Sequence, residues 1–171
     1  MKKRIKLNSK GQGFEVFNLL IGAILALAIL VIILSIINYL ESIEVDSSIQ
    51  SIHQKLINAT QSPDGSVFVS KKVILPKDYS FNSKQFSLVL NIPEECISFD
   101  FPQAITSMSF PSSGRSAIFF NKRIQTDFFV VCQPESSEPL VFNDGSQMDC
   151  PVSCNEFCCL ASFGANPSLR N

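Results

Sequence analysis

The chain has 171 residues, of which 46% are hydrophobic and 17% are charged, and its net charge at pH 7 is −1. Five of the fourteen basic residues lie within the first ten positions, with no acid among them. From residue 11 onward nine basic residues accompany all fifteen acids, and the resulting charge of −6 argues against nucleic-acid binding, which requires a basic surface.

A basic leader, residues 1–13, precedes an uncharged apolar run that extends from Leu19 to Ile37. About 20 helical residues at ~1.5 Å each cross the ~30 Å of bilayer hydrocarbon, so the run predicts a transmembrane helix over about residues 17–38. Basic residues precede the run and acids follow it, which predicts a single-pass cell-membrane protein with a cytoplasmic N-terminus and an extracellular C-terminal domain. The run is too long for ordinary signal peptidase and lacks a small-x-small site, so we expect the helix to be retained.

The junction between leader and apolar run contains a carboxylate, in the sequence Lys10-Gly11-Gln12-Gly13-Phe14-Glu15. A charged side chain costs ~2.5–3.5 kcal/mol at the bilayer centre, so Glu15 requires either the membrane interface or a partner. One interpretation is an interfacial residue that interacts with the positive end of the helix dipole.

The same junction resembles the class III signal peptide of type IV pilin-like proteins, including archaeal pilins and archaellins. In that family a prepilin peptidase cuts after a glycine, the apolar helix stays on the mature protein, and a glutamate near the new N-terminus takes part in assembly. The resemblance implies cleavage between Gly11 and Gln12, or alternatively between Gly13 and Phe14, and an assembly role for Glu15. The two cuts would make Glu15 the fourth or the second mature residue, whereas the family usually has its glutamate at the fifth. The implied partners are the membrane, a prepilin peptidase, and copies of the chain or other pilin-like subunits.

Beyond the apolar run the hydrophobic residues become one-sided and recur at steps of three and four: Leu40, Ile43, Ile49, Ile52, Leu56 and Ala59. This pattern predicts one long helix over residues 14–61, which ends before the turn at residues 62–65. The apolar stripe would pack either on the protein's own β-domain, as in pilin-like proteins, or in a juxtamembrane stalk or short coiled coil.

Residues 66–145 contain short β-branched and aromatic runs separated by Pro, Asn, Ser and Gly, which predicts an extracytoplasmic β-domain. The predicted strands are Ser66–Leu75, Gln85–Ile92, Cys96–Phe101, Ala117–Phe120 and Thr126–Cys132, with Leu140–Phe142 at an edge. No helix-sized crossover separates them, which favours an antiparallel sheet or sandwich. The segment Val73–Phe81 is similar to hairpins of archaeal pilin-like ectodomains. The predicted fold class is therefore α+β: a long N-terminal helix, an antiparallel β-domain, and a cysteine-rich C-terminal segment, residues 146–171.

All six cysteines follow the predicted helix: Cys96, Cys132, Cys150, Cys154, Cys158 and Cys159. An even number in an exported domain predicts disulfides. Fifteen pairings are open, and Cys96 with Cys132 is one plausible pair because each ends a predicted strand. A metal or iron–sulfur site in the last four is the alternative, but their spacing matches neither paired zinc-type blocks nor ferredoxin runs, so we expect no metal and no cofactor.

The sequence contains no recognisable pattern of an enzyme active site. His53 is the sole histidine, and we expect it to be solvated on the polar side of the long helix. Glu94 and Glu95 suit a solvated surface, and neither a GxSxG elbow nor a glycine-rich phosphate loop is present. Asn58 begins a sequon for N-glycosylation.

The expected function is that of a pilin-like subunit of a cell-surface filament or related secretion assembly. The alternative is a stand-alone membrane-anchored domain that serves in extracellular binding, adhesion or envelope structure.

Overall fold

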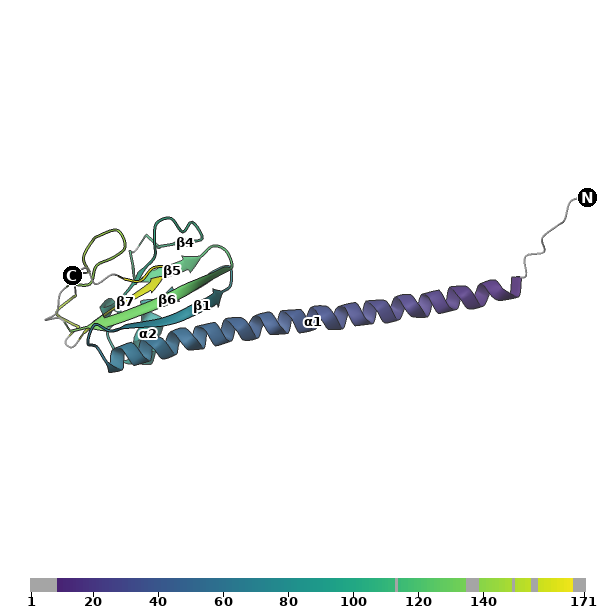
Figure 1. The fold of residues 1–171 in the computed structure, drawn as a ribbon, viewed down its shortest axis with the longest axis horizontal. Helices are drawn as coiled ribbons and strands as arrows, with labels where there is room; N and C mark the ends of the chain where they lie inside the picture. The colour runs from purple at the N-terminus through teal and green to yellow at the C-terminus, as the bar shows by residue number, and fades with distance from the viewer. Residues whose placement is uncertain (1–8, 113, 135–138, 149, 155–156, 168–171) are drawn as a thin grey trace, which may run out of the picture. The chain divides into compact units, whose positions relative to one another are not determined.

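The computed structural model describes residues 9–112, 114–134, 139–148, 150–154 and 157–167, with side chains from Val16 onward. The chain divides into two compact units, Met1–Ile43 and Glu44–Asn171, which are described separately below. The first unit contains the N-terminal part of α1, a helix that extends over Ser9–Gln61 (Figure 1). The predicted helix therefore ends where expected and begins a little earlier than expected, within the leader.

Within its described residues the second unit contains the last turns of α1, two β-sheets and two short helices. The larger sheet has the strand order β1 (Val67–Leu75), β6 (Ile124–Gln133), β7 (Cys158–Phe163), β3 (Ile97–Asp100). The smaller sheet has the order β2 (Tyr79–Asn82), β5 (Ala117–Phe120), β4 (Met108–Ser109). The short helices are α2 (Ser83–Leu90) and the 3-10 turn η1 (Glu94–Cys96). The predicted α+β class is confirmed.

Most of the predicted strands are found with small changes in their ends. Strands β1, β3 and β6 lie within a few residues of their predicted bounds, and β5 has the predicted bounds. The predicted edge strand Leu140–Phe142 is reduced to a single bridge between Val141 and Gln147. Short β-branched and aromatic runs thus located β1, β3, β5 and β6, whereas β2 and β4 match none of the predicted strand ranges.

The predicted strand Gln85–Ile92 is wrong, because this segment forms α2. The side chain of Asn82 accepts a hydrogen bond from the backbone N–H of Lys84 at 2.8 Å, which caps the helix start. Asn91 adopts a left-handed conformation, with φ of 56°, and ends the helix. These two asparagines are helix boundary signals that the strand prediction did not take into account.

The predicted hairpin over Val73–Phe81 is also wrong. Strands β1 and β2 belong to different sheets, because the N–H of Asp78 donates to the carbonyl of Phe120 at 2.8 Å and directs β2 toward β5. The larger sheet is not purely antiparallel either, since β3 and β7 run parallel. Their connection passes through three other strands, so a parallel pair forms without a helical crossover.

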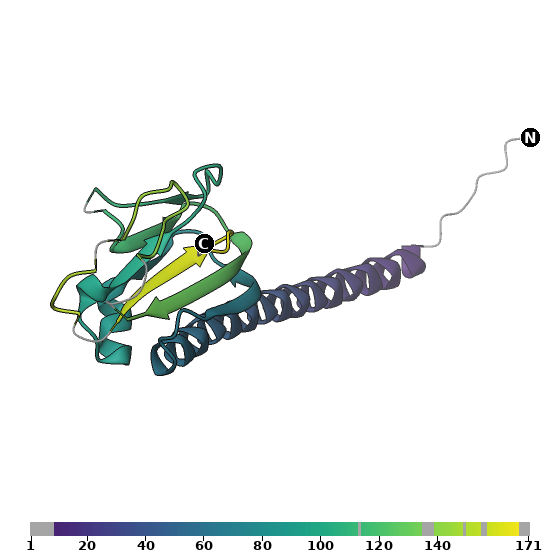
Figure 2. The ribbon, with the colours of Figure 1, turned by 60° about the vertical axis from the view of Figure 1, so that its left-hand side comes forward.

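The cysteine-rich C-terminal segment contributes β7, one of the two inner strands of the larger sheet. This strand lies between β6 and β3, and all six of its residues are buried (Figure 2). The larger sheet is therefore incomplete without a segment that the sequence suggested would be held mainly by disulfides.

The core of the second unit is rich in phenylalanine. The ring of Phe81 lies 5.4 Å from that of Phe86, 6.0 Å from Phe120 and 5.6 Å from Phe163, measured between centroids. The stripe of α1 joins this core through three buried residues: Ile52, Leu56 and Ala59. Packing of the stripe on the protein's own domain is confirmed for Ile52, Leu56 and Ala59, so these turns are not a free stalk, whereas Leu40 and Ile43 of the same stripe are exposed.

Candidate functional site

The apolar part of α1 is exposed around its whole circumference. Its large side chains are 40–76% exposed between Val16 and Ile37, and its most apolar window has a mean hydropathy of 3.3 with none of that window buried. Within the described residues this is the helix long and apolar enough to cross a membrane, by length and composition. Among the described residues of the Met1–Ile43 unit, none covers this large apolar surface.

The residues implied in processing and assembly lie in the first turns of α1. Gly11, Gln12, Gly13 and Phe14 belong to the helix as backbone, and so does Glu15. Their side chains lie outside the described residues, so cleavage at either glycine and an assembly role for Glu15 stay predictions.

Beyond the apolar run, α1 is attached to the edge of the larger sheet. The hydroxyl of Ser48 accepts a hydrogen bond from the N–H of Ile74 in β1 at 2.9 Å, and the hydroxyls of Ser51 and Ser70 lie 2.5 Å apart. Because β1 is an edge strand, an N–H that points away from the sheet would otherwise lack a protein partner. The helix thus covers part of this edge with hydroxyls as well as packing on the core.

His53 is not solvated as predicted. It is half-buried, and its ring meets that of Phe86 edge-on at 5.3 Å. Burial lowers the pKa of His53 below its ordinary value, which favours the neutral ring. The side chain therefore serves the packing between α1 and α2.

Three disulfides use all six cysteines: Cys96–Cys154, Cys132–Cys159 and Cys150–Cys158. The suggested pair of Cys96 with Cys132 is wrong. Cys132 lies directly opposite Cys159 on neighbouring strands, with 4.1 Å between their Cα atoms. Strand β7 lies between β3 and β6, so Cys96, directly before β3, is kept away from Cys132 in β6. The sulfur of Cys96 instead bonds to Cys154, in the loop before β7.

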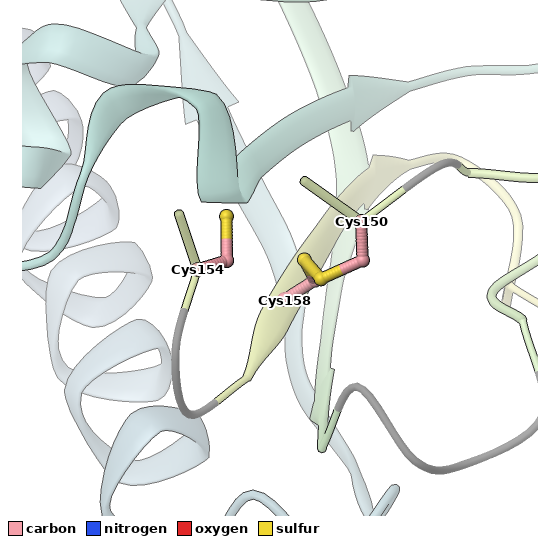
Figure 3. Close-up of side chains that lie close together, drawn as sticks. All are labelled: Cys150, Cys154 and Cys158. Atoms are coloured by element: carbon pink, nitrogen blue, oxygen red, sulfur yellow. A yellow bond between two sulfur atoms is a disulfide. The ribbon is translucent and has the colours of Figure 1, made fainter. Parts of the chain in front are cut away.

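The sulfur atoms of Cys150, Cys154 and Cys158 all lie within 4.8 Å of one another (Figure 3). Thiolates at this spacing suit a soft metal ion. Each of these sulfurs belongs to a disulfide, however, and a disulfide sulfur offers no thiolate. In the disulfide-bonded state Cys154 therefore links the C-terminal segment to Cys96 in η1, and Cys150–Cys158 closes a loop within the segment.

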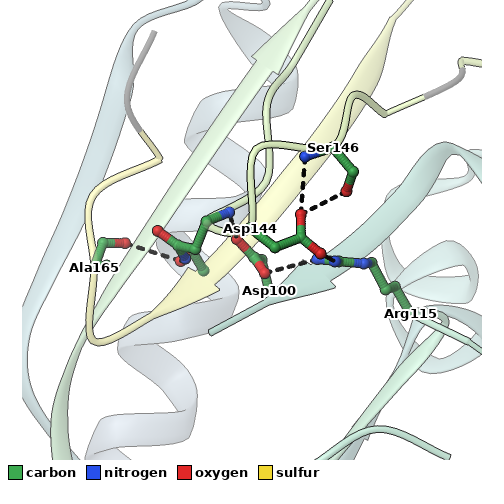
Figure 4. A network of polar contacts seen from close by, with 7 residues as sticks. Asp100, Arg115, Asp144, Ser146 and Ala165 are labelled. Carbon is green, nitrogen blue, oxygen red and sulfur yellow. Dashed lines mark hydrogen bonds and ion pairs between the residues drawn. The ribbon is translucent and has the colours of Figure 1, made fainter. Parts of the chain in front are cut away.

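A partly buried polar network, which the sequence did not reveal, centres on Arg115: Asp100 is buried, Arg115 is half-buried and Asp144 is exposed. Its guanidinium donates to the carboxylates of Asp100 at 2.7 Å and Asp144 at 2.5 Å (Figure 4). The guanidinium also lies over the ring of Phe142 at 3.8 Å. The second oxygen of Asp100 accepts from the N–H of Asn143 at 2.7 Å. Burial raises the pKa of Asp100 more than these bonds lower it.

This network fixes the loop around residues 142–146 onto β3. Asp144 accepts two further hydrogen bonds, from the backbone and hydroxyl of Ser146. A cavity of about 330 Å³ adjoins the network, and its lining combines apolar side chains such as Phe101, Ile105 and Met108 with the network's own charged groups. Because both carboxylates are engaged by Arg115 and by backbone or hydroxyl donors, the arrangement is suited to holding the loop and offers no free acid–base pair.

The remaining sequence-predicted residues lie apart from this network. Glu94 and Glu95 are exposed in η1, as expected for a solvated pair. Asn58 is half-buried on α1, and its side-chain oxygen accepts a hydrogen bond from Gln54 at 3.0 Å.

Comparisons of the chain with family models, with curated proteins and with solved structures gave no match in any of the three.

Proposed function

We propose that the chain is a pilin-like subunit of a cell-surface filament or related secretion assembly. In this proposal a prepilin peptidase removes the basic leader at the cytoplasmic face, and the apolar helix first anchors the subunit in the membrane. Copies then pack these helices against one another, and the β-domain lies outside the cell. The role is structural, and no enzymatic activity is proposed.

The observation that carries the proposal is the division of α1 into two halves with different surroundings. Its C-terminal turns bury Ile52, Leu56 and Ala59 in a β-domain, whereas the side chains from Val16 to Ile37 are exposed on all sides. A helix that serves only as an anchor does not need to continue into the core of the domain. A helix that must position the domain when subunits assemble does need to continue into the core, because packed side chains then hold the helix and the domain in one fixed arrangement.

Small residues on the apolar helix also support packing between helices. Gly22 has no side-chain neighbour within 4 Å of the position a Cβ would take, and Ala23 and Ala26 lie within one turn of it. Without a hydrophobic driving force inside lipid, helices associate mainly where small residues allow close approach. This surface is therefore available to a second helix either in the membrane or in a filament.

The test of this proposal is the N-terminus of the protein recovered from membranes or from sheared surface material. Intact mass should place it at Gln12 or Phe14. Changing Gly11 and Gly13 separately to a bulky residue should show which bond is cut, since blocking the used site leaves the basic leader in place. An intact leader in the wild-type protein would favour the alternative, a stand-alone anchored domain for extracellular binding or envelope structure.

A further inference from the structure

Two of the three disulfides lie against each other. One is Cys96–Cys154 and the other is Cys150–Cys158. The sulfur of Cys154 lies within 4.8 Å of the sulfurs of Cys150 and Cys158 (Figure 3). A thiolate exchanges with a disulfide by direct attack on one of its sulfurs, which gives a mixed disulfide. A thiolate released at Cys150 or Cys158 would therefore already lie close to a second disulfide.

The third disulfide, Cys132–Cys159, lies on the other face of the larger sheet. Cys158 and Cys159 are neighbours in β7, and successive side chains of a strand point to opposite faces. Cys132 and Cys159 belong to the phenylalanine-rich core. Cys158 belongs to a second buried cluster, which also contains Cys96 and Cys154. Exchange that begins at Cys158 therefore reaches Cys154 and leaves the third disulfide untouched.

Cys150 is the cysteine most accessible to a thiolate from outside the chain. It is half-buried, whereas each of the other five cysteines is at most 2% exposed. Its disulfide also closes the shortest loop, with a sequence separation of 8 against 27 and 58, so it constrains the chain least. Attack on the sulfur of Cys150 releases Cys158 as the leaving group.

The second disulfide can accept the released thiolate. Cys158 lies in an apolar cluster, where a negative charge is poorly solvated. Attack of the Cys158 thiolate on Cys154 forms a Cys154–Cys158 bond and leaves the charge on Cys96. Cys96 lines a cavity of about 310 Å³ together with the polar residues Asn91 and Ser153, and a cavity of this size and polarity has room for water. Water can therefore supply a proton to Cys96.

We propose that these two neighbouring disulfides form a thiol-capture site, whose substrate is a thiolate from outside the chain. The thiolate bonds to Cys150, and the pairing then shifts so that Cys96 carries the free thiol. The captured group stays attached because Cys158, which would otherwise expel it, is now bonded to Cys154. The thiolate can belong to a small thiol or to a cysteine of another exported protein. The inference goes beyond the proposed filament and does not depend on it.

The exchange balances without an oxidant or a reductant. Each of its two steps forms one sulfur–sulfur bond and breaks one, and one thiolate enters while another leaves. The thiolate left on Cys96 takes up a proton from water, because Glu94 and Glu95 precede it and disfavour a further negative charge. A neutral thiol is not the attacking species, so the reverse exchange is slowed.

Alkylation after treatment with a thiol tests the site. The full chain in detergent micelles is incubated without oxygen with one equivalent of mercaptoethanol, and N-ethylmaleimide then caps the free thiols. Peptide mapping without reduction should find mercaptoethanol on Cys150 and maleimide on Cys96. A new Cys154–Cys158 disulfide should be present, and the third disulfide should be intact. In a second arm, a peptide with one cysteine replaces mercaptoethanol at equal thiolate concentration, and the faster of the two identifies the kind of thiol that the site takes.

Two double variants separate the capture from the shift in pairing. Cys150→Ser/Cys158→Ser removes the point of entry, so neither mercaptoethanol nor maleimide should be attached. Cys96→Ser/Cys154→Ser keeps the point of entry, so the maleimide should move to Cys158, and the yield of adduct should fall because Cys158 expels the captured thiol. Far-UV circular dichroism checks that each variant is folded, and the map of the wild-type chain decides alone for a variant that is not.

Three results for the wild-type chain would overturn the inference. Maleimide on Cys158, with Cys96–Cys154 intact, would show that the pairing does not shift. Mercaptoethanol on a cysteine other than Cys150, or on none, would remove the point of entry. Opening of the third disulfide as fast as Cys150–Cys158 would show unselective reduction in place of a site.

Discussion

Replacing Leu56 with alanine tests whether the amphipathic half of α1 is part of the folded domain. Leu56 is 1% exposed and contacts the phenylalanine-rich core. Leu→Ala changes at such positions cost ~2–5 kcal/mol, through lost burial and the cavity left behind. Because a helix packed by one face can shift toward the gap, we expect the lower half of that range, about 2–3 kcal/mol.

The assay is urea unfolding of the full chain in detergent micelles, followed by far-UV circular dichroism. With a slope of ~1–3 kcal/mol per molar for small domains, a loss of this size lowers the midpoint by about 1–2 M. Leu88→Ala is the matched control, because Leu88 is 79% exposed on α2 and should change the free energy of unfolding by less than ~0.5 kcal/mol. Equal midpoints for Leu56→Ala and Leu88→Ala would refute the packing of α1 on the core.

Three further predictions concern single positions in the same unit. Gly164→Ala should lower the free energy of unfolding more than Gly114→Ala. Both glycines have a positive φ, but of the two only Gly164 has an atom, Ile105 Cδ1, 2.7 Å from where a Cβ would lie. Equal urea midpoints for the two variants would contradict this. Peptide mapping without reduction should recover the three observed disulfides, and a Cys96–Cys132 peptide would refute the assignment. Removing Cys96–Cys154 should lower the free energy of unfolding by about 4 kcal/mol, against about 2.5 kcal/mol for Cys150–Cys158, because Cys96–Cys154 closes the longer loop. Proton NMR titration should give His53 a pKa below its ordinary 6.5, and a pKa at or above 6.5 would contradict the burial. Because the unfolded chain then takes up the proton first, the free energy of unfolding should decrease as pH falls through 6.5, and His53→Gln should remove this pH dependence.

The sequence was sufficient to locate the long helix and most strands, because their signals are local. The apolar run and the stripe of Ile52, Leu56 and Ala59 follow helical periodicity, and β5 is a short apolar run between turns. The stripe records burial without naming what covers it, so the choice between β-domain and stalk required the packed structure. The apolar residues of α2 led to a strand prediction, whereas Asn82 and Asn91 cap the two ends of the segment as a helix.

The features that sequence did not reveal depend on residues far apart in the chain. Strand β7 was hidden because Cys158–Phe163 was considered only as part of a disulfide framework. Five of its six residues are nevertheless apolar, with only Ser162 polar, and such a short apolar run is consistent with a fully buried strand. The pairing of Cys132 with Cys159 follows from the register of β6 and β7. The bond from Arg115 to Asp144 joins positions 29 residues apart, so no local sequence pattern indicates it.

The mature N-terminus is the measurement that tests the central claim most directly. Intact-mass analysis of the protein extracted from membranes of cells that carry a prepilin peptidase should give a chain that begins at Gln12 or Phe14. The same chain from cells without that peptidase should keep its leader and begin at or near Met1. A mature protein that retains residues 1–11 in both cells would contradict the pilin-like account and leave α1 as a membrane anchor.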